Sequence, residues 1–178
     1  EKWREVCDDS FNQVSVDNCE STSDMSFLLS SQKIETEEKE FWNALSEITQ
    51  ELAQKIAADG EGATHLIEVE VQNAQTKKEA QILAKSVVTS DLLKAAVAGH
   101  DSNWGRICSA LGSTKIDFDP GEISIFLDGQ PAYIQGESIK ICHPEKIFQE
   151  KKVCILIDMS RGKKSAKAWG CDLTEEYV

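Results

Sequence analysis

Apolar residues recur at steps of three and four between residues 36 and 58. The residues of this stripe are Phe41, Leu45, Ile48, Leu52 and Ile56. Because this spacing places them on one face of a helix, it predicts an amphipathic helix over residues 36–58. Thr36 is a suitable N-cap, Glu37 suits the positive end of the helix dipole, and Gly60 can end the helix.

The same periodicity predicts three further helices, over residues 77–88, 91–98 and 103–111. In the first of them, Ala80, Leu83, Ala84 and Val87 are expected to point inward. Ser90 is a suitable cap for the second, and Gly112 is expected to end the third. Residues 2–10 read as the end of another helix. Ser21–Asp24 has the pattern of a capping box, which predicts a helix that begins with Met25–Leu29.

Other segments have the composition and alternation of strands. Leu66–Val71 predicts a strand with Glu68 and Glu70 facing water, and Phe11–Val16 is strand-like. Two hairpins are also predicted. The first joins residues 123–127 to 131–134 around Asp128-Gly129, and the second joins residues 153–157 to 166–171 around Arg161-Gly162.

Helices mixed with strands, followed mainly by strands, predict an α+β or mixed α/β fold in which helices pack on mixed sheets. A chain of this length is expected to form a single region over residues 1–178. Two lobes are compatible with the pattern, a helix-rich one over residues 1–115 and a strand-rich one over residues 116–178.

The composition is that of an ordinary soluble protein. The chain has 178 residues, of which 40% are hydrophobic and 28% charged, and its formal net charge is −12. Since phosphate-backbone binding needs clustered basic residues, nucleic acid is not expected as a partner. The longest apolar stretches, such as Val153–Ile157, fall far short of the roughly 20 residues that cross a bilayer, so no membrane association is expected. Acidic residues at the N-terminus do not fit a signal peptide.

Six cysteines are scattered along the chain, and no two have the short spacing of a zinc knuckle. A chain of this length can bury an adequate core without disulfides. Reduced thiols in the cytoplasm are therefore the expected state, and neither a metal ion nor a cofactor is expected.

The first segment with candidate chemistry is Asp59-Gly60-Glu61-Gly62, at the predicted junction of a helix and a strand. Glycine on both sides of Glu61 removes Cβ bulk and permits positive φ, so another backbone or a ligand can approach the carboxylate closely. Glu61 could then bind the ammonium group of a substrate. The alternative is a turn that ends the helix and leaves Glu61 in water.

The second segment is Gly99–Arg106, which joins two predicted helices. One of the residues 101–103 can cap the second helix, and Arg106 could hold a carboxylate near its N-terminus. Alternatively, Trp104 fills the core and Arg106 pairs with an acidic side chain. Ser21–Asp24 allows a similar choice between an anion-binding helix start and a simple cap.

A nucleophile with a partner base is not visible in the sequence. Glycine-rich phosphate loops and the Gly-x-Ser-x-Gly motif are missing, and no cysteine has an identifiable histidine partner. The histidines are isolated from one another and are expected to have surface or structural roles; they are His65, His100 and His143.

These segments together resemble the C-terminal part of the bifunctional ornithine acetyltransferase and N-acetylglutamate synthase family of arginine biosynthesis. Each matching block alone is weak, but the blocks follow one another along nearly the whole chain. They are Phe11–Asp17 with Ser21–Asp24, Asp59–Thr64, Ser90–Ala96, Asp101–Ile107, Ala168–Thr174 and Tyr177–Val178.

The resemblance implies a precursor that cleaves itself before a threonine into an α chain and a β chain, with this chain in the β-chain region. The exposed threonine would take the acetyl group from N-acetylornithine and pass it to glutamate in a ping-pong reaction, with its own amine as the base. Acetyl-CoA is a candidate co-substrate because some relatives use it. The implied partner is the α chain in an α2β2 assembly, and no metal is implied.

The family threonine would lie upstream of Glu1, so no residue of this chain is predicted to be catalytic. The oxyanion-hole threonines and a substrate-contacting lysine would belong to the α chain, and further contact residues would follow Val178. The resemblance gives Glu61 the role of binding the amine on the ornithine side. Two alternatives stay open: a non-catalytic binding module of the same fold, and a related self-processing aminopeptidase.

Overall fold

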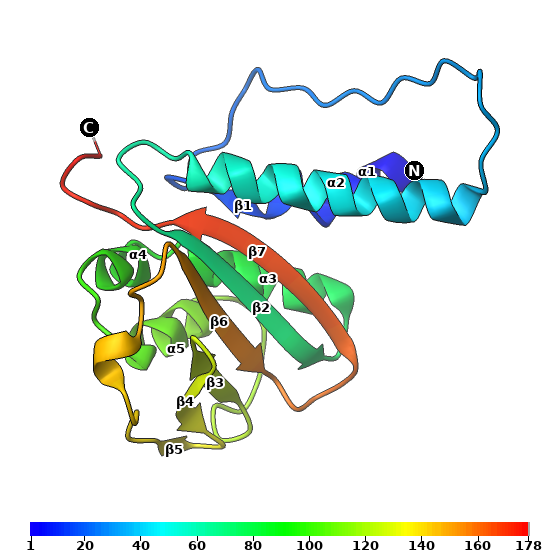
Figure 1. Ribbon diagram of the computed structural model, residues 1–178. Coiled ribbons are helices and arrows are strands. Elements are labelled where there is room, and N and C mark those ends of the chain that lie inside the picture. Colours follow the sequence, from blue (N-terminus) through cyan, green and yellow to red (C-terminus); the bar gives the residue numbers. More distant parts are fainter. Residues whose placement is uncertain (178) are drawn as a thin grey trace.

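The computed structural model describes residues 1–177. Within them, one seven-stranded sheet has the strand order β1-β7-β2-β6-β3-β4-β5 (Figure 1). The strands are β1 (Val14–Ser15), β2 (Leu66–Ala74), β3 (Ser124–Leu127), β4 (Gln130–Ile134), β5 (Glu137–Ser138), β6 (Lys152–Asp158) and β7 (Lys164–Cys171). Parallel and antiparallel pairs are both present, as expected for a mixed sheet.

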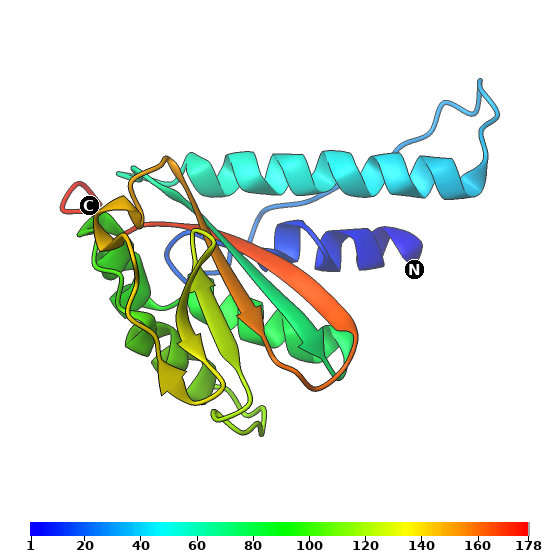
Figure 2. The same ribbon diagram turned by 60° about the horizontal axis from the view of Figure 1, so that its bottom comes forward.

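Helices cover both faces of this sheet. They are α1 (Lys2–Asp8), α2 (Glu38–Ala58), α3 (Lys77–Val88), α4 (Asp91–Ala98) and α5 (Trp104–Gly112), with 3-10 turns η1 (Phe11–Gln13) and η2 (Pro144–Lys146). Helices α3, α4 and α5 lie on one face, and α2 crosses β1, β7 and β2 on the other (Figures 1 and 2). The predicted mixed α/β fold, with helices packed on a mixed sheet, is confirmed.

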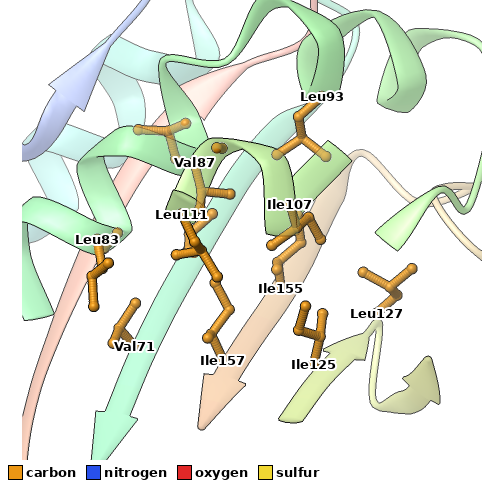
Figure 3. Packing of buried hydrophobic residues seen from close by; sticks show 14 of the residues in the cluster. Val71, Leu83, Val87, Leu93, Ile107, Leu111, Ile125, Leu127, Ile155 and Ile157 are labelled. Atoms are coloured by element: carbon orange, nitrogen blue, oxygen red, sulfur yellow. The ribbon is translucent and has the colours of Figure 1, made fainter. Parts of the chain in front are cut away.

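The main core lies between the sheet and helices α3 to α5. Side chains of every second residue of β2 point into it, and so do apolar residues of the helices and of β3 and β6 (Figure 3). The four residues predicted to point inward from α3 are fully buried: Ala80, Leu83, Ala84 and Val87. The alternating apolar residues of the strands and the apolar residues at helical spacing in α3 therefore form one apolar layer.

Elements with a clear local signal form where they are predicted. Helix α3 spans the predicted residues, and the Thr76 side chain caps it by accepting from the backbone N–H of Glu79 at 3.1 Å. Ser90 caps α4 in the same way. Strands β3 and β4 form the predicted antiparallel hairpin, whose turn residues Asp128 and Gly129 both have positive φ. Such a turn matches the twist of the paired strands.

The second predicted hairpin is wrong. Strand β2 lies between β6 and β7, parallel to the first and antiparallel to the second, so the two strands do not pair with each other. The segment around Arg161 crosses the end of β2 instead, where the Arg161 backbone N–H donates to Asn73 O at 2.8 Å. The sequence between β6 and β7 contains no local sign that β2, from earlier in the chain, is inserted between these two strands. The sheet thereby joins strands from residues 1–115 and from 116–177.

The helix predicted to begin with Met25–Leu29 is also wrong, because residues 16–37 contain no helix or strand. The capping geometry itself forms: Ser21 Oγ accepts from the backbone N–H of Asp24 at 3.2 Å. No helix follows because the apolar side chains have nothing to pack against; Leu29 is 90% exposed. The strand-like segment 11–16 becomes η1 and the two residues of β1.

Glu68 was predicted to face water, and this prediction is wrong. It is buried on the α2 side of the sheet, where its carboxylate accepts hydrogen bonds from Trp169 Nε1 at 2.9 Å and from Lys152 and Lys167 at 3.0 Å each. The alternation of β2 correctly places Glu68 opposite the core residues. It could not show that α2 crosses this part of the sheet.

Helix α2 turns its predicted apolar stripe away from the sheet. Its buried residues are small, namely Thr49, Ala53 and Ala57. Phe41 is 37% exposed, Ile48 55%, Leu52 44% and Ile56 51%. The helix begins after Glu37, without a side-chain cap from Thr36, and its C-cap is Asp59.

None of the helices in residues 1–177 combines the length and the apolar character that a membrane span needs.

Candidate functional site

The turn that carries Glu61 lies between α2 and β2. It is closed by a hydrogen bond from the Ala63 N–H to Gly60 O at 3.0 Å, and Gly62 has a positive φ of 68°. A Cβ atom on Gly60 would lie 2.7 Å from Cys171 Sγ, and one on Gly62 would lie 2.7 Å from the backbone carbon of Glu176. The two glycines thus permit a close approach of other chain segments, while the Glu61 side chain is exposed.

The C-terminal segment packs over this turn. Thr174 Oγ1 donates to Gly62 O at 2.7 Å, and the Tyr177 hydroxyl donates to Asp17 Oδ2 at 3.0 Å. Asp17, the second residue after β1, is thereby brought to the same corner of the molecule as the α2–β2 turn. Val178, the last residue of the Tyr177–Val178 block, lies outside the described residues.

The corner around Glu61 is acidic. The hydrogen bond to Asp17 raises the pKa of Tyr177, and the negative charges of Asp17 and Glu61 add to this rise. The pKa of Asp17 is lowered, first by the backbone N–H of Cys19 and then by the Tyr177 hydroxyl, so Asp17 is an anion at neutral pH. In the described part of the chain, Glu61 has no ion-pair partner. A free carboxylate in a negative field suits an incoming cation.

Asp172 holds the start of β2 beneath this corner. Its buried carboxylate accepts from the backbone N–H groups of Thr64 at 2.8 Å and His65 at 2.9 Å. It also accepts from Thr64 Oγ1 at 2.5 Å and lies 2.8 Å from His65 Nδ1. Burial raises the pKa of Asp172, but these hydrogen bonds outweigh it and leave the pKa below its ordinary value.

Lys94 of α4 is the second buried charge near the turn. It is 1% exposed, and its Nζ donates to Val16 O at 2.5 Å and Cys171 O at 2.6 Å. Because Val16 and Cys171 also pack against Gly60, Lys94 joins α4 to the two chain segments that the turn contacts. The sequence pattern placed Lys94 on a helix and gave no sign of this role.

In the Asp101–Arg106 segment, the structure agrees with the interpretation in which Trp104 packs on the core and Arg106 pairs with an acidic side chain. Arg106 Nη2 lies 3.6 Å from Asp101 Oδ2, and Arg106 Nη1 donates to Leu92 O. Trp104 is partly buried and stacks on Tyr133, with 4.7 Å between ring centroids. Asn103 is the N-cap residue of α5 but makes no capping hydrogen bond.

The prediction that the histidines are isolated from one another is wrong for two of them. The rings of His65 and His100 meet edge to face, with 5.4 Å between centroids, and His65 also contacts Asp172. His143 is exposed and lies 3.2 Å from Glu145. The six cysteines are free, and no group of three or more candidate ligands is placed to hold a metal ion within residues 1–177.

A cavity of about 210 Å³ lies elsewhere, between η1, α2, α3 and β7, and does not include Glu61. Its lining is polar and largely paired within the protein; for example, Gln81 Nε2 donates to Asp9 Oδ1 at 3.0 Å. The exposed Glu61 carboxylate on its glycine-flanked turn, which has no ion-pair partner within residues 1–177, and not a cavity, makes this corner the candidate site.

Sequence reasoning found Glu61 but missed Asp17, Asp172 and Tyr177 as members of this corner. They lie far apart in the sequence, so no local spacing connects them. The available signal was that each lies in one of the blocks that carry the family resemblance.

Comparison with known proteins covers the whole chain. The model of the ArgJ family matches residues 1–178. The arginine biosynthesis bifunctional protein ArgJ of Thermotoga neapolitana is 43% identical, over 96% of this chain and 47% of the relative. The glutamate N-acetyltransferase of Methanopyrus kandleri is 40% identical, over 98% of this chain and 48% of the relative. The chain thus spans about half the length of these relatives.

The fold has a close match among solved structures. A crystal structure of the arginine biosynthesis bifunctional protein ArgJ from Bacillus halodurans superposes with a TM-score of 0.89 and 34% sequence identity. The match covers 99% of this chain and 88% of the crystallised chain.

Proposed function

The chain belongs to the ArgJ family, and we propose that it forms part of an acetyltransferase that moves an acetyl group from N-acetylornithine to glutamate. The names of the relatives support this reaction class. The transfer proceeds through an acetyl-threonine, formed on a threonine that lies outside this chain. The alternatives, a non-catalytic module and a self-processing aminopeptidase, have no specific observation in their favour.

The observation that carries this proposal is the Glu61 carboxylate. It is exposed at an acidic corner without a partner in residues 1–177, on a turn packed from two sides. N-acetylornithine has a free side-chain ammonium after its α-amine is acetylated, and this ammonium needs an anion. In a pocket that another polypeptide closes over, the pairing would gain strength as water is excluded.

The nucleophile and the groups that stabilise the oxyanion are proposed to come from the α chain and from the start of the β chain. An N-terminal threonine can use its own amine to activate the hydroxyl. The chain alone is then expected to be inactive, and the active form is an α2β2 assembly in the cytoplasm. Acetyl-CoA is a candidate acetyl donor, and no metal enters the reaction.

The surface supports a requirement for a second polypeptide. The exposed stripe of α2 is preceded in the chain by a segment whose apolar residues are also exposed, among them Met25, Phe27 and Leu29. Strands β6 and β3 extend the sheet beyond α2 (Figure 2). On these strands Cys154 is exposed, and Leu156 and Phe126 are partly exposed. Exposed apolar side chains in such number are typical of an interface.

The complete reading frame provides the direct test. We expect its product to exchange acetyl between N-acetylornithine and glutamate, while residues 1–178 alone give no exchange. Hydrolysis of short peptides without acetyl exchange would favour the aminopeptidase, and inactivity in both assays would favour the binding module.

A single substitution tests the role of Glu61. In the complete enzyme, Glu61→Ala is expected to raise KM for N-acetylornithine by about 10- to 100-fold, because a charge-assisted pair worth about 1.5–3 kcal/mol is lost. Glu137→Ala is the matched control, since Glu137 is an exposed carboxylate on β5 at the opposite end of the sheet. An unchanged KM for Glu61→Ala would remove this residue from the site.

A further inference from the structure

Asp172 is placed to control the geometry of the Glu61 turn. It follows β7 directly, is 2% exposed, and accepts hydrogen bonds from the backbone N–H groups of Thr64 and His65, the two residues that precede β2. Its own backbone N–H donates to His65 O at 3.2 Å, which extends the β2–β7 pairing by one residue. The side chain of Asp172 thus holds Thr64 and His65, and its main chain adds a second hold on His65.

The turn needs such an anchor because of its glycines. Gly60 and Gly62 flank Glu61, and glycine has the least restricted backbone of all residues. Without a fixed end, the Gly-Glu-Gly segment would sample many conformations and the Glu61 carboxylate would have no defined position. Asp172 fixes the segment from Thr64 onward, and the hydrogen bond from Thr174 Oγ1 to Gly62 O holds its middle.

The two side-chain donors show that Asp172 is needed as a carboxylate. Thr64 Oγ1 and His65 Nδ1 contact the same oxygen, Oδ2, at 2.5 and 2.8 Å, while both backbone N–H groups contact Oδ1. Each carboxylate oxygen is therefore used by two groups. An asparagine could keep the two backbone hydrogen bonds through its oxygen, whereas an alanine would lose all four contacts.

We propose that Asp172 is a positioning residue for substrate binding, which fixes the Glu61 turn so that the carboxylate meets the side-chain ammonium of the acetyl donor. This inference rests on the proposed function of Glu61. In a ping-pong reaction, kcat/KM for the donor reports the first half-reaction alone. Glutamate has no side-chain ammonium, so its binding should not depend on the position of Glu61.

The test compares both substrates in the complete enzyme. Asp172→Ala is expected to lower kcat/KM for N-acetylornithine about tenfold, mainly through KM, in line with loss of a positioned charge pair. The value for glutamate should change by less than about twofold. Asp172→Asn should fall between wild type and Asp172→Ala. Equal losses for both substrates, or no change for the donor, would overturn the proposal.

Asp128 offers a matched control for stability. Its carboxylate accepts from the backbone N–H groups of Phe148 and Cys154, at 2.8 Å each, in a hairpin turn on the other side of β6. Asp128→Asn should destabilise the protein without raising KM for N-acetylornithine. If it raises KM as much as Asp172→Asn does, a general loss of stability explains both effects and the proposal fails.

Hydrogen exchange separates this inference from the proposed function. In the full chain, Asp172→Ala is expected to speed amide exchange at Thr64 and His65 and across residues 60–63, because it removes both backbone hydrogen bonds. If wild-type protein transfers no acetyl group, the proposed function fails, and exchange decides the positioning claim by itself. Unchanged exchange in residues 60–65 would overturn it.

Discussion

Gly62 combines two constraints at one residue. Its φ of 68° lies in the left-handed region, and a Cβ atom would lie 2.7 Å from the Glu176 backbone carbon. Left-handed φ costs a non-glycine residue about 1–2 kcal/mol, and displacing the C-terminal segment adds to this. We expect Gly62→Ala to lower the free energy of unfolding by more than about 2 kcal/mol, measured by urea denaturation.

Gly129→Ala is the control that separates the two constraints. Gly129 also has a positive φ, of 78°, but a Cβ atom there would meet nothing within 4 Å. This variant should show the conformational cost alone, about 1–2 kcal/mol. Equal losses of stability for the two variants would mean that the C-terminal segment moves away from a Cβ at residue 62 without a loss of free energy.

For single residues, the sequence could predict only those features that depend on adjacent residues in the chain. Glu61 was predicted as a candidate because its two flanking glycines are adjacent to it. Asp172 was missed because its partners Thr64 and His65 lie more than 100 residues away. A buried carboxylate at a strand end has no local pattern of its own.

At the scale of elements, α2 shows that an amphipathic pattern does not say which partner buries it. Its apolar stripe is exposed, and the complete enzyme is expected to cover it. We expect Ile48→Ser and Leu52→Ser to change the free energy of unfolding of residues 1–178 by less than about 0.5 kcal/mol. In the complete enzyme, each should cost about 1–2 kcal/mol, because apolar area buried by the partner is lost.

Ala53 gives the opposite control for α2. It is fully buried between α2 and the sheet, so Ala53→Leu should overpack the contact and cost about 1–3 kcal/mol in both forms. Urea denaturation of both forms checks the pair of predictions. Equal effects of Leu52→Ser in the two forms would show that the stripe stays in water.

An element could be predicted when contacts between residues close in the sequence stabilise it, and not when its stability depends on distant parts of the chain. Helices α3 and α4 formed at the predicted bounds because their caps and their inward faces are local. The helix expected at Met25–Leu29 had a cap but no surface to pack on. The expected pairing of β6 with β7 failed because the parallel pairing of β2 with β6 comes from residues far away in the sequence.

At the scale of the whole molecule, the sheet explains how distant residues meet at the site. Because β2 pairs with β7, the residues before β2 and after β7 lie side by side, and β1 brings Asp17 to the same end of β7. Glu61, Asp172 and Asp17 thus share one corner. The mixed class of this sheet was predictable from the sequence, but its strand order was not.

The same corner links stability of the whole molecule to pH. The folded pKa of Asp172 lies below the ordinary value of 3.8, and that of Glu68 lies below 4.5. A depressed carboxyl pKa contributes stability above the unfolded pKa, and this contribution is lost as pH falls through the folded pKa. The free energy of unfolding should therefore fall on acidification below about pH 4.5, where the unfolded chain begins to take up protons at these carboxyls and the folded protein does not yet do so. Urea denaturation between pH 6 and pH 3 measures this fall, and Asp172→Asn should show a flatter slope from a lower starting stability. Identical slopes in wild type and variant would mean that the four hydrogen bonds to Asp172 do not favour its charged form.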